Sequence, residues 1–170
     1  GYSYVRISGG EPTLCFDHLV AVIEEVPEDL TFILETNGIL IGYDKSYARR
    51  LASFGNVVVR VSIKGTNREE FHMLTGAREE FFDYQLKALE NLLEAGMRPG
   101  RDFYAAVMLS FSPEENIEKL LRRLKEIHPD LVEIDPEYVI LYPHVVELLR
   151  RTGLKPRKAY TLDGVPEFMI

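Results

Sequence analysis

The sequence predicts an α/β fold in which about five mostly parallel strands alternate with helices. Short apolar runs rich in β-branched residues recur at residues 4–8, 31–35, 57–63, 103–109 and 131–135. Several of these runs are apolar almost throughout, which is typical of strands covered on both faces in a parallel sheet. Segments with helical spacing separate the runs, and this alternation indicates right-handed βαβ units.

Helical patterns fill the intervals between the predicted strands. The clearest begins at Ser112-Pro113-Glu114-Glu115, which has the form of a capping box with proline at the first helical position. A second covers about residues 80–95, with apolar residues on one stripe and a glycine directly after it. Weaker patterns cover about 16–26 and 45–54. After residue 142 the alternation stops, and VVELLRR predicts one more helix before the tail.

Composition restricts the classes of protein to which the chain can belong. Its 170 residues, 46% of them hydrophobic, suffice for one domain with a proper core. A net charge of -7 argues against a surface devoted to nucleic acid or anionic lipid. The sequence has no apolar run near the roughly 18 residues of a membrane span and no signal-peptide pattern. We therefore expect a cytoplasmic protein without a membrane partner.

Cysteine content and the first residues carry two further expectations. Cys15 is the single cysteine, so an internal disulfide is excluded and no zinc or iron-sulfur site can form from this chain's thiolates alone. A lone cysteine is most often a small buried hydrophobe, and we expect burial here. The chain begins with Gly1 and enters a predicted strand almost at once, which favours a fragment of a longer protein.

The loops that leave the carboxyl ends of parallel strands converge on one rim, where ligands bind. The first predicted strand runs into Gly9-Gly10-Glu11-Pro12. Paired glycines let the backbone approach a ligand closely, and the carboxylate with bare carbonyls suits an ammonium group. An ordinary strand-to-helix turn explains the same four residues equally well.

Polar residues also end the next two predicted strands. Thr36 and Asn37 offer hydroxyl and amide groups suited to ribose hydroxyls, although Asn-Gly is also a strong turn signal. Ser62 and Lys64 lie on the same side of their strand by period-two alternation, and a hydroxyl beside an ammonium suits a carboxylate. Solvated residues at a strand end are the alternative, because lysine is mostly exposed.

In combination these motifs resemble a known family. GGEP after one strand, ETNG after the next, SIKG after a third and F-H-x-L-T-G at 71–76 resemble the radical SAM superfamily, most of all the glycyl-radical activating enzymes of the pyruvate formate-lyase type. The resemblance covers roughly residues 4–127. It implies an incomplete (βα)6 partial TIM-type barrel, S-adenosylmethionine (SAM) as cofactor, and reductive SAM cleavage at a [4Fe-4S] cluster to a 5′-deoxyadenosyl radical that abstracts hydrogen.

The resemblance also assigns roles to individual positions. It implies that the first loop takes the methionyl amino group of SAM, that polar residues at the next two strand ends approach the ribose and the carboxylate, and that apolar residues near later strands lie against adenine. It implies a histidine near the active rim at His72, where a plain helix-surface histidine is the alternative. The implied SAM residues are, in that order, Gly9, Gly10, Glu11 and Pro12, then Thr36, Asn37, Ser62 and Lys64, then Met108, Leu109, Leu141 and Tyr142.

One defining element of the family is absent from the chain. The CxxxCxxC motif, whose thiolates hold the cluster, does not occur in the sequence. The resemblance places this motif upstream of the GGEP loop, so we expect a missing N-terminal segment of the same protein to carry it; a degenerate homologue without a cluster is the alternative. We divide the chain into a truncated core at 1–141 and a C-terminal helix and tail at 142–170.

Several partners follow from these expectations. The resemblance implies a glycyl-radical enzyme or another protein as substrate, whereas a non-catalytic module would bind only a nucleoside or a protein. Loss of a strand would leave a free sheet edge through which the chain self-associates. RNA is disfavoured by the net charge, but a cluster of basic residues leaves it open as a partner: Arg150, Arg151, Lys155, Arg157 and Lys158.

Overall fold

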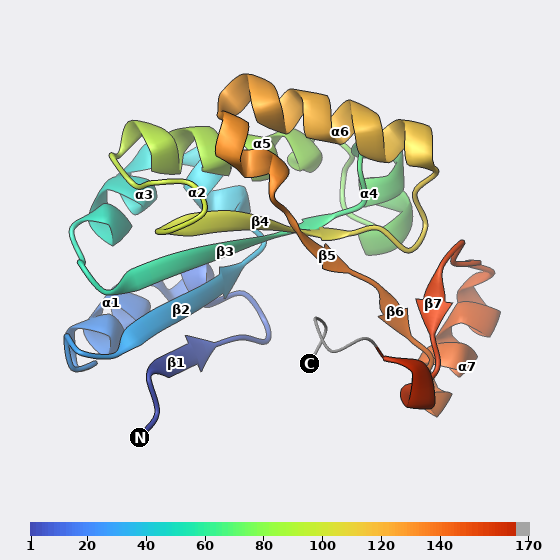
Figure 1. The fold of residues 1–170 in the computed structure, drawn as a ribbon, viewed down its shortest axis with the longest axis horizontal. Helices are drawn as coiled ribbons and strands as arrows, with labels where there is room; N and C mark the ends of the chain where they lie inside the picture. Colours follow the sequence, from blue (N-terminus) through green and yellow to red (C-terminus); the bar gives the residue numbers. More distant parts are fainter. Residues whose placement is uncertain (166–170) are drawn as a thin grey trace.

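A five-stranded sheet forms the centre of the computed structural model, which describes residues 1–165 (Figure 1). The strands lie in the sheet in chain order, and every neighbouring pair is parallel. The predicted α/β fold with parallel strands is therefore confirmed. The strands are β1 (Tyr4–Ile7), β2 (Thr31–Thr36), β3 (Val57–Lys64), β4 (Phe103–Met108) and β5 (Asp135–Glu137).

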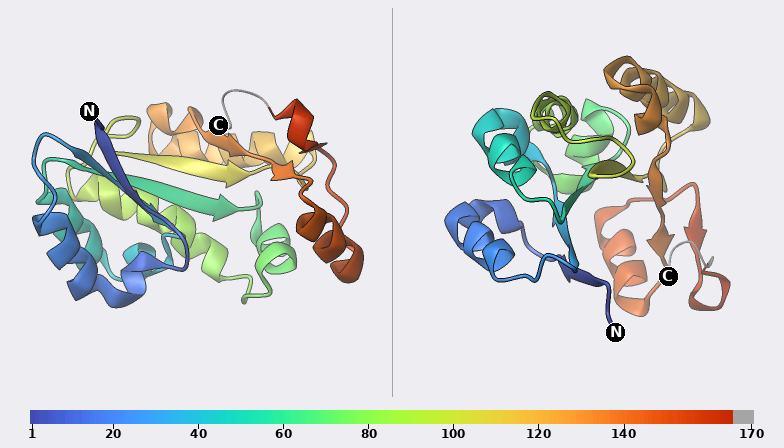
Figure 2. Two further views of the ribbon diagram at one scale, coloured as in Figure 1. Left: turned by 90° about the horizontal axis from the view of Figure 1, so that it is seen from below. Right: turned by 60° about the vertical axis from the view of Figure 1, so that its left-hand side comes forward.

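The helices that connect the strands cover the convex side of a curved sheet. Figure 2 shows them outside the curve, as expected for a partial barrel of the TIM type. The predicted helices at 16–26, 45–54 and 80–95 are confirmed, and every observed end lies within two residues of the predicted one. The helices of this layer are α1 (Phe16–Glu24), α2 (Ile39–Tyr43), α3 (Lys45–Ala52), α4 (Arg68–Thr75), α5 (Phe81–Glu94) and α6 (Glu114–Ile127), and α7 (Pro143–Thr152) lies outside it.

The core lies between the sheet and these helices. Along β3 buried and partly exposed residues alternate strictly, and Val59 and Val61 have no exposed surface. They face α5, whose Leu89 and Leu92 are equally inaccessible to water. Each such side chain stabilises the fold by about 1.5–3 kcal/mol through burial. The other face of β3, on the concave side, carries Val58 and then the polar residues Arg60, Ser62 and Lys64.

The fifth strand lies later in the chain than predicted. Residues 131–135 were expected as a strand, but Pro129–Val132 form a 3₁₀ helix and pairing with β4 begins only at Asp135. Leu131 is the anchor of this turn, with 1% of its surface exposed. Because its side chain fills the core at the end of α6, the chain reaches the sheet edge only afterwards. That edge tolerates Pro136, which has no N–H to donate.

The capping box predicted for α6 does not form. The helix begins one residue later than expected, Pro113 is its N-cap, and no side chain caps its first turn. Ser112 instead donates its hydroxyl to Glu70 Oε2 at 2.6 Å. As an N-cap, Ser112 would accept a hydrogen bond from a backbone N–H of the helix. Here its hydroxyl is a donor to a buried carboxylate, and a hydrogen bond to an ionised acceptor is the stronger of the two.

The C-terminal part of the described chain packs loosely. β6 (Val139–Ile140) and β7 (Ala159–Tyr160) form a separate two-stranded parallel sheet, and α7, the predicted VVELLRR helix, has no buried residue. β6 precedes residue 142 and β7 follows it, so their pairing connects the predicted core at 1–141 with the predicted C-terminal segment at 142–170. The division of the chain between residues 141 and 142 stays a prediction. Among residues 1–165, no helix is both long and apolar enough to cross a membrane.

β1 lies at one edge of the sheet. Its only strand partner within residues 1–165 is β2, and Tyr4 and Val5 expose 66% and 37% of their surface. An accessible edge of this kind is what the expected self-association requires. That expectation stays a prediction.

Candidate functional site at the strand ends

A cleft of about 340 Å³ opens where β1, β2 and β3 end, at the side of the sheet to which their arrows point in Figure 1. Seven of the residues implied as SAM ligands line it, so the predicted convergence of three loops on one rim is observed. The cleft is lined by Gly9, Gly10, Glu11, Glu35, Thr36, Asn37, Arg60, Ser62, Lys64 and Glu137.

The first loop has a backbone that only glycine adopts readily. Gly9 and Gly10 have φ values of 89° and 59°, in the left-handed region. A Cβ atom at either position would meet nothing within 4 Å. The requirement for glycine is therefore conformational, and the space beside this backbone is open to a ligand.

Glu11 joins the first loop to the second. Its Oε1 accepts hydrogen bonds from Thr13 N at 3.1 Å, Thr13 Oγ1 at 2.6 Å and Thr36 Oγ1 at 2.6 Å. Its Oε2 accepts one from Asn37 N at 2.6 Å. The carboxylate that the sequence suggested as free for an ammonium group thus already holds two loops together, and one oxygen keeps capacity for a further donor.

The second loop is built as a tight turn and a helix start. Thr36 is buried, and its hydroxyl accepts a hydrogen bond from Gly38 N at 3.0 Å. Asn37 Oδ1 accepts one from Ile39 N at 2.9 Å, at the beginning of α2. The turn explanation of Asn-Gly is therefore correct, and Asn37 nonetheless lines the cleft.

The third strand supplies both cations of the cleft, Arg60 and Lys64. Ser62 and Lys64 both line the cleft, which confirms their predicted position on one side of the strand. Lys64 Nζ donates to Glu137 Oε2 at 2.7 Å. Burial alone would raise the pKa of Glu137, but Lys64 and Arg60 outweigh burial and hold that pKa below its usual range. Glu137 is consequently ionised at neutral pH.

Sequence reasoning missed a network of charges on the concave face. Arg60 is central, with NH1 lying 3.2 Å from Glu35 and 2.9 Å from Glu137, and NH2 2.8 Å from Asp135. The sequence contained a sign of this network, because the alternation that places Ser62 and Lys64 on one face of β3 places Arg60 on that face as well. Its partners come from β2 and β5, however, and only sheet register reveals them.

The remaining implied SAM residues lie outside the cleft lining. Pro12 opens the 3₁₀ helix Pro12–Cys15, and Met108 pairs in register with Lys64 and Glu137. Leu109 is 6% exposed and belongs to the core behind the sheet. Leu141 and Tyr142 follow β6, where Tyr142 stacks on His144. Their contact with a cofactor stays a prediction.

Cys15 was expected to be buried, and this was wrong. It is exposed, because a 3₁₀ helix repeats every three residues and turns Thr13 and Phe16 inward instead. Within residues 1–165, no group of three histidine, cysteine or acidic side chains could hold a metal. The described residues therefore do not fit an iron-sulfur cluster.

Two further predicted features lie on the surface. His72 is exposed, and its Nδ1 lies 2.7 Å from Ala77 O, as in the plain helix-surface alternative. In the basic cluster Arg150 pairs with Glu147, and Lys158 lies over the ring of Tyr138. RNA contact by this cluster stays a prediction.

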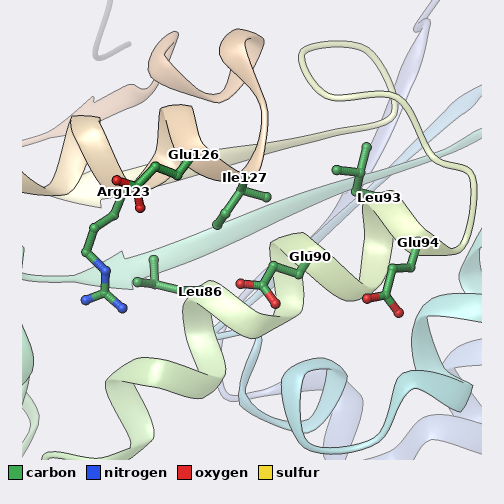
Figure 3. A pocket seen from close by; sticks show the side chains of 7 residues that line it. All are labelled: Leu86, Glu90, Leu93, Glu94, Arg123, Glu126 and Ile127. Atoms are coloured by element: carbon green, nitrogen blue, oxygen red, sulfur yellow. The ribbon is translucent and has the colours of Figure 1, made fainter.

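A second hollow, of about 450 Å³, lies between α5 and α6 on the outer side of the helix layer (Figure 3). It contains none of the predicted residues. Its apolar wall is the seam between the two helices, with Leu86, Leu93 and Ile127, and charged side chains border it. We therefore place the candidate site at the strand ends, where loops from separate strands converge.

The profile of the Radical SAM superfamily matches residues 1–124. The chain belongs to this superfamily. The match includes β1 to β4 and most of α6, and hence every strand end that lines the cleft except that of β5. The predicted family is thereby confirmed.

Curated relatives include cyclases and a maturase. The chain is 26% identical, over 97% of its length, to a probable GTP 3',8-cyclase of Methanosarcina acetivorans, and it spans 53% of that protein. It is 36% identical, over 55% of its length, to the mycofactocin maturase MftC of Mycolicibacterium smegmatis, of which it spans 23%. The chain thus spans about half the length of the first of these relatives and about a quarter of the second.

A solved structure has the same fold. SuiB of Streptococcus suis, crystallised with S-adenosylmethionine, superposes with a TM-score of 0.59 at 22% identity. The superposition covers 93% of this chain and 37% of SuiB. The partial-barrel interpretation of the curved sheet is therefore confirmed.

Proposed function

We propose that the cleft at the strand ends binds SAM, and that this chain is the SAM-binding part of a radical SAM enzyme. The observation that carries the proposal is that loops after β1, β2 and β3 bring an open glycine backbone, hydroxyl and amide groups and one ammonium into a single cleft. These groups complement the amino acid and ribose parts of SAM. Membership of the superfamily supports the same ligand.

The residues in the cleft fit SAM by their chemistry. Lys64 and Ser62 suit the carboxylate, since an ammonium and a hydroxyl both donate hydrogen bonds to it. The loop at Gly9 and Gly10 leaves space for close backbone approach. Lys64 is already paired with Glu137, so binding a carboxylate there extends an existing ion network and leaves no buried charge unpaired.

SAM, when bound at a [4Fe-4S] cluster, supplies a 5′-deoxyadenosyl radical through reductive cleavage at its sulfonium. In this proposal the described residues bind and orient the cofactor, and a cluster would need thiolates that this sequence, with its single cysteine, does not contain. The named relatives act on different compounds by their titles, a GTP cyclisation in one case and mycofactocin maturation in another. None of them is a glycyl-radical activating enzyme, and we propose no such partner.

Replacing Ser62 by tyrosine tests the ligand site. Ser62 lines the cleft and is partly exposed, so the larger side chain enters the cleft and not the core. We expect SAM affinity to fall by at least about tenfold, because the ring occupies the space of the ligand. Isothermal titration with SAM measures the affinity, and thermal unfolding checks that the fold persists.

Ser46→Tyr is the matched control for this experiment. Ser46 is exposed in the first turn of α3, away from the cleft lining, so SAM affinity should stay within about twofold of wild type. Unchanged affinity in Ser62→Tyr, or equal loss in both variants, would contradict the proposed site.

A further inference from the structure

Gln85 lies directly beneath the cleft and has no exposed surface. It belongs to α5, and its Nε2 donates to Asn37 O and to Ser62 O, both at 2.8 Å. Its Oε1 accepts a hydrogen bond from Lys64 N at 3.4 Å. All three partners are backbone groups of residues that line the cleft, so one buried side chain connects two of its loops.

The hydrogen bonds of Gln85 lie where the sheet ladder opens. The pairing of β2 with β3 ends at Thr36 and Val61, and the next two residues are Asn37 and Ser62. β3 continues alongside β4 to Lys64, whereas β2 turns away. The amide of Gln85 bridges the first unpaired carbonyl on each side. It thereby sets the separation of two strand ends that no backbone ladder holds together.

α5 is pressed closely against this opening. Gly38 has a φ of 76°, and a Cβ there would lie 2.8 Å from Val61 Cγ1 and 3.1 Å from Ala88 Cβ. Glycine at position 38 therefore lets α5 pack closely enough for the Gln85 side chain to reach both strand ends. The length and the amide of glutamine both matter here.

We propose that Gln85 is a positioning residue of the SAM site, which fixes the distance between the second and third loops without touching the ligand. The inference rests on the proposed function for the identity of the ligand, whereas the role of Gln85 in fixing the distance between the two loops does not depend on it. A buried donor that spans two carbonyls is costly to lose, because both acceptors are then left without their partner.

Gln85→Met and Gln85→Glu separate the effect of the amide's hydrogen bonds from the effect of the size of the side chain. Methionine keeps the length and removes both hydrogen-bonding groups, so we expect SAM affinity to fall about tenfold at every pH. Glutamate at pH 8 directs a carboxylate at two carbonyl oxygens, and the loss should be at least as large. As the pH is lowered to about 6, a protonated carboxyl group can donate to one carbonyl, and affinity relative to wild type should recover.

Asn91→Asp is the matched control. Asn91 is another buried amide of α5, about 9 Å further along the helix axis, and its Nδ2 donates to Ile41 O at 2.8 Å and Gly42 O at 3.2 Å. The variant places a carboxylate against two carbonyls as Gln85→Glu does. We expect a comparable loss of stability with SAM affinity within about twofold of wild type.

Hydrogen exchange provides a measurement that does not depend on SAM. Peptides covering residues 36–39 and 61–65 should exchange faster than in wild type in both Gln85 variants. In Asn91→Asp the exchange rate of the same peptides should equal that of wild type. Equal SAM affinity in wild type and Gln85→Met, or equal losses in Gln85→Glu and Asn91→Asp, would overturn the inference. If wild type itself does not bind SAM, the proposed function fails, and unchanged exchange in the Gln85 variants would overturn the positioning role separately.

Discussion

Replacing Glu70 by alanine is expected to lower the free energy of unfolding by about 3–4 kcal/mol. Glu70 is 8% exposed in the first turn of α4. Its Oε2 accepts hydrogen bonds from Thr66 N at 2.8 Å, Thr66 Oγ1 at 2.7 Å and Ser112 Oγ at 2.6 Å. Its Oε1 accepts from Asn116 Nδ2 at 2.9 Å and from Asn67 Nδ2 at 3.3 Å. Alanine leaves these donors in place without an acceptor, which is the costly way to lose a buried network.

Glu69→Ala provides the control for this prediction. Glu69 is the neighbouring glutamate of the same helix turn and is exposed, so both variants lose a similar interaction with the helix dipole. We expect Glu69→Ala to stay within about 0.5 kcal/mol of wild type in urea unfolding. A loss for Glu70→Ala no larger than that of Glu69→Ala would show that the network contributes little.

The same residue makes stability depend on acid pH. Burial alone would raise the pKa of Glu70, but hydrogen bonds from Ser112, Asn116 and Thr66 outweigh it and hold the pKa below the ordinary 4.5. A carboxyl group whose pKa is lower in the folded state stabilises the fold above its unfolded pKa, and this contribution is lost as pH falls through the folded value. Glu70→Gln lacks the titration, so its deficit in free energy of unfolding should shrink as pH falls below about 4.5.

Gly42→Ala is expected to destabilise the fold by at least about 3 kcal/mol or to prevent folding. A Cβ at this position would lie 1.9 Å from Tyr84 O and 2.7 Å from Tyr84 C, both backbone atoms of α5. Alanine raises helix propensity over glycine by about 1 kcal/mol, so propensity by itself predicts the opposite sign. The steric clash outweighs the gain in helix propensity, because α2 and α5 would have to separate.

Gly55→Ala distinguishes this clash from a general effect of glycine loss. A Cβ at Gly55 would meet nothing within 4 Å. We expect its urea midpoint to remain close to that of wild type, while Gly42→Ala shifts strongly downward. A Gly42→Ala protein within about 1 kcal/mol of wild type would mean that the two helices do not pack as described.

Local sequence patterns determined a large part of the fold and of the site. Alternation of apolar strands and helical segments predicts the parallel sheet, because each helix returns the chain to the start of the next parallel strand. Coverage on both faces was expected and is not observed, since β2 and β3 alternate buried and partly exposed residues. Period-two spacing places Ser62 and Lys64 on the same side of β3, as observed. The paired glycines of the first loop predict a backbone conformation that other residues rarely adopt, and their positive φ values agree with this. In each case the physical cause acts within a few neighbouring residues, and the sequence contains it.

Tertiary structure alone decided which groups those side chains meet. Glu11 bonds to Asn37, Gln85 to Ser62, and Glu70 to Ser112, pairs separated by 26, 23 and 42 residues. Burial of Leu131 likewise delayed the fifth strand, and a contact with Glu70 removed Ser112 from its predicted cap. A local pattern sets the direction of a side chain relative to its own element, whereas its partner depends on sheet register and helix packing.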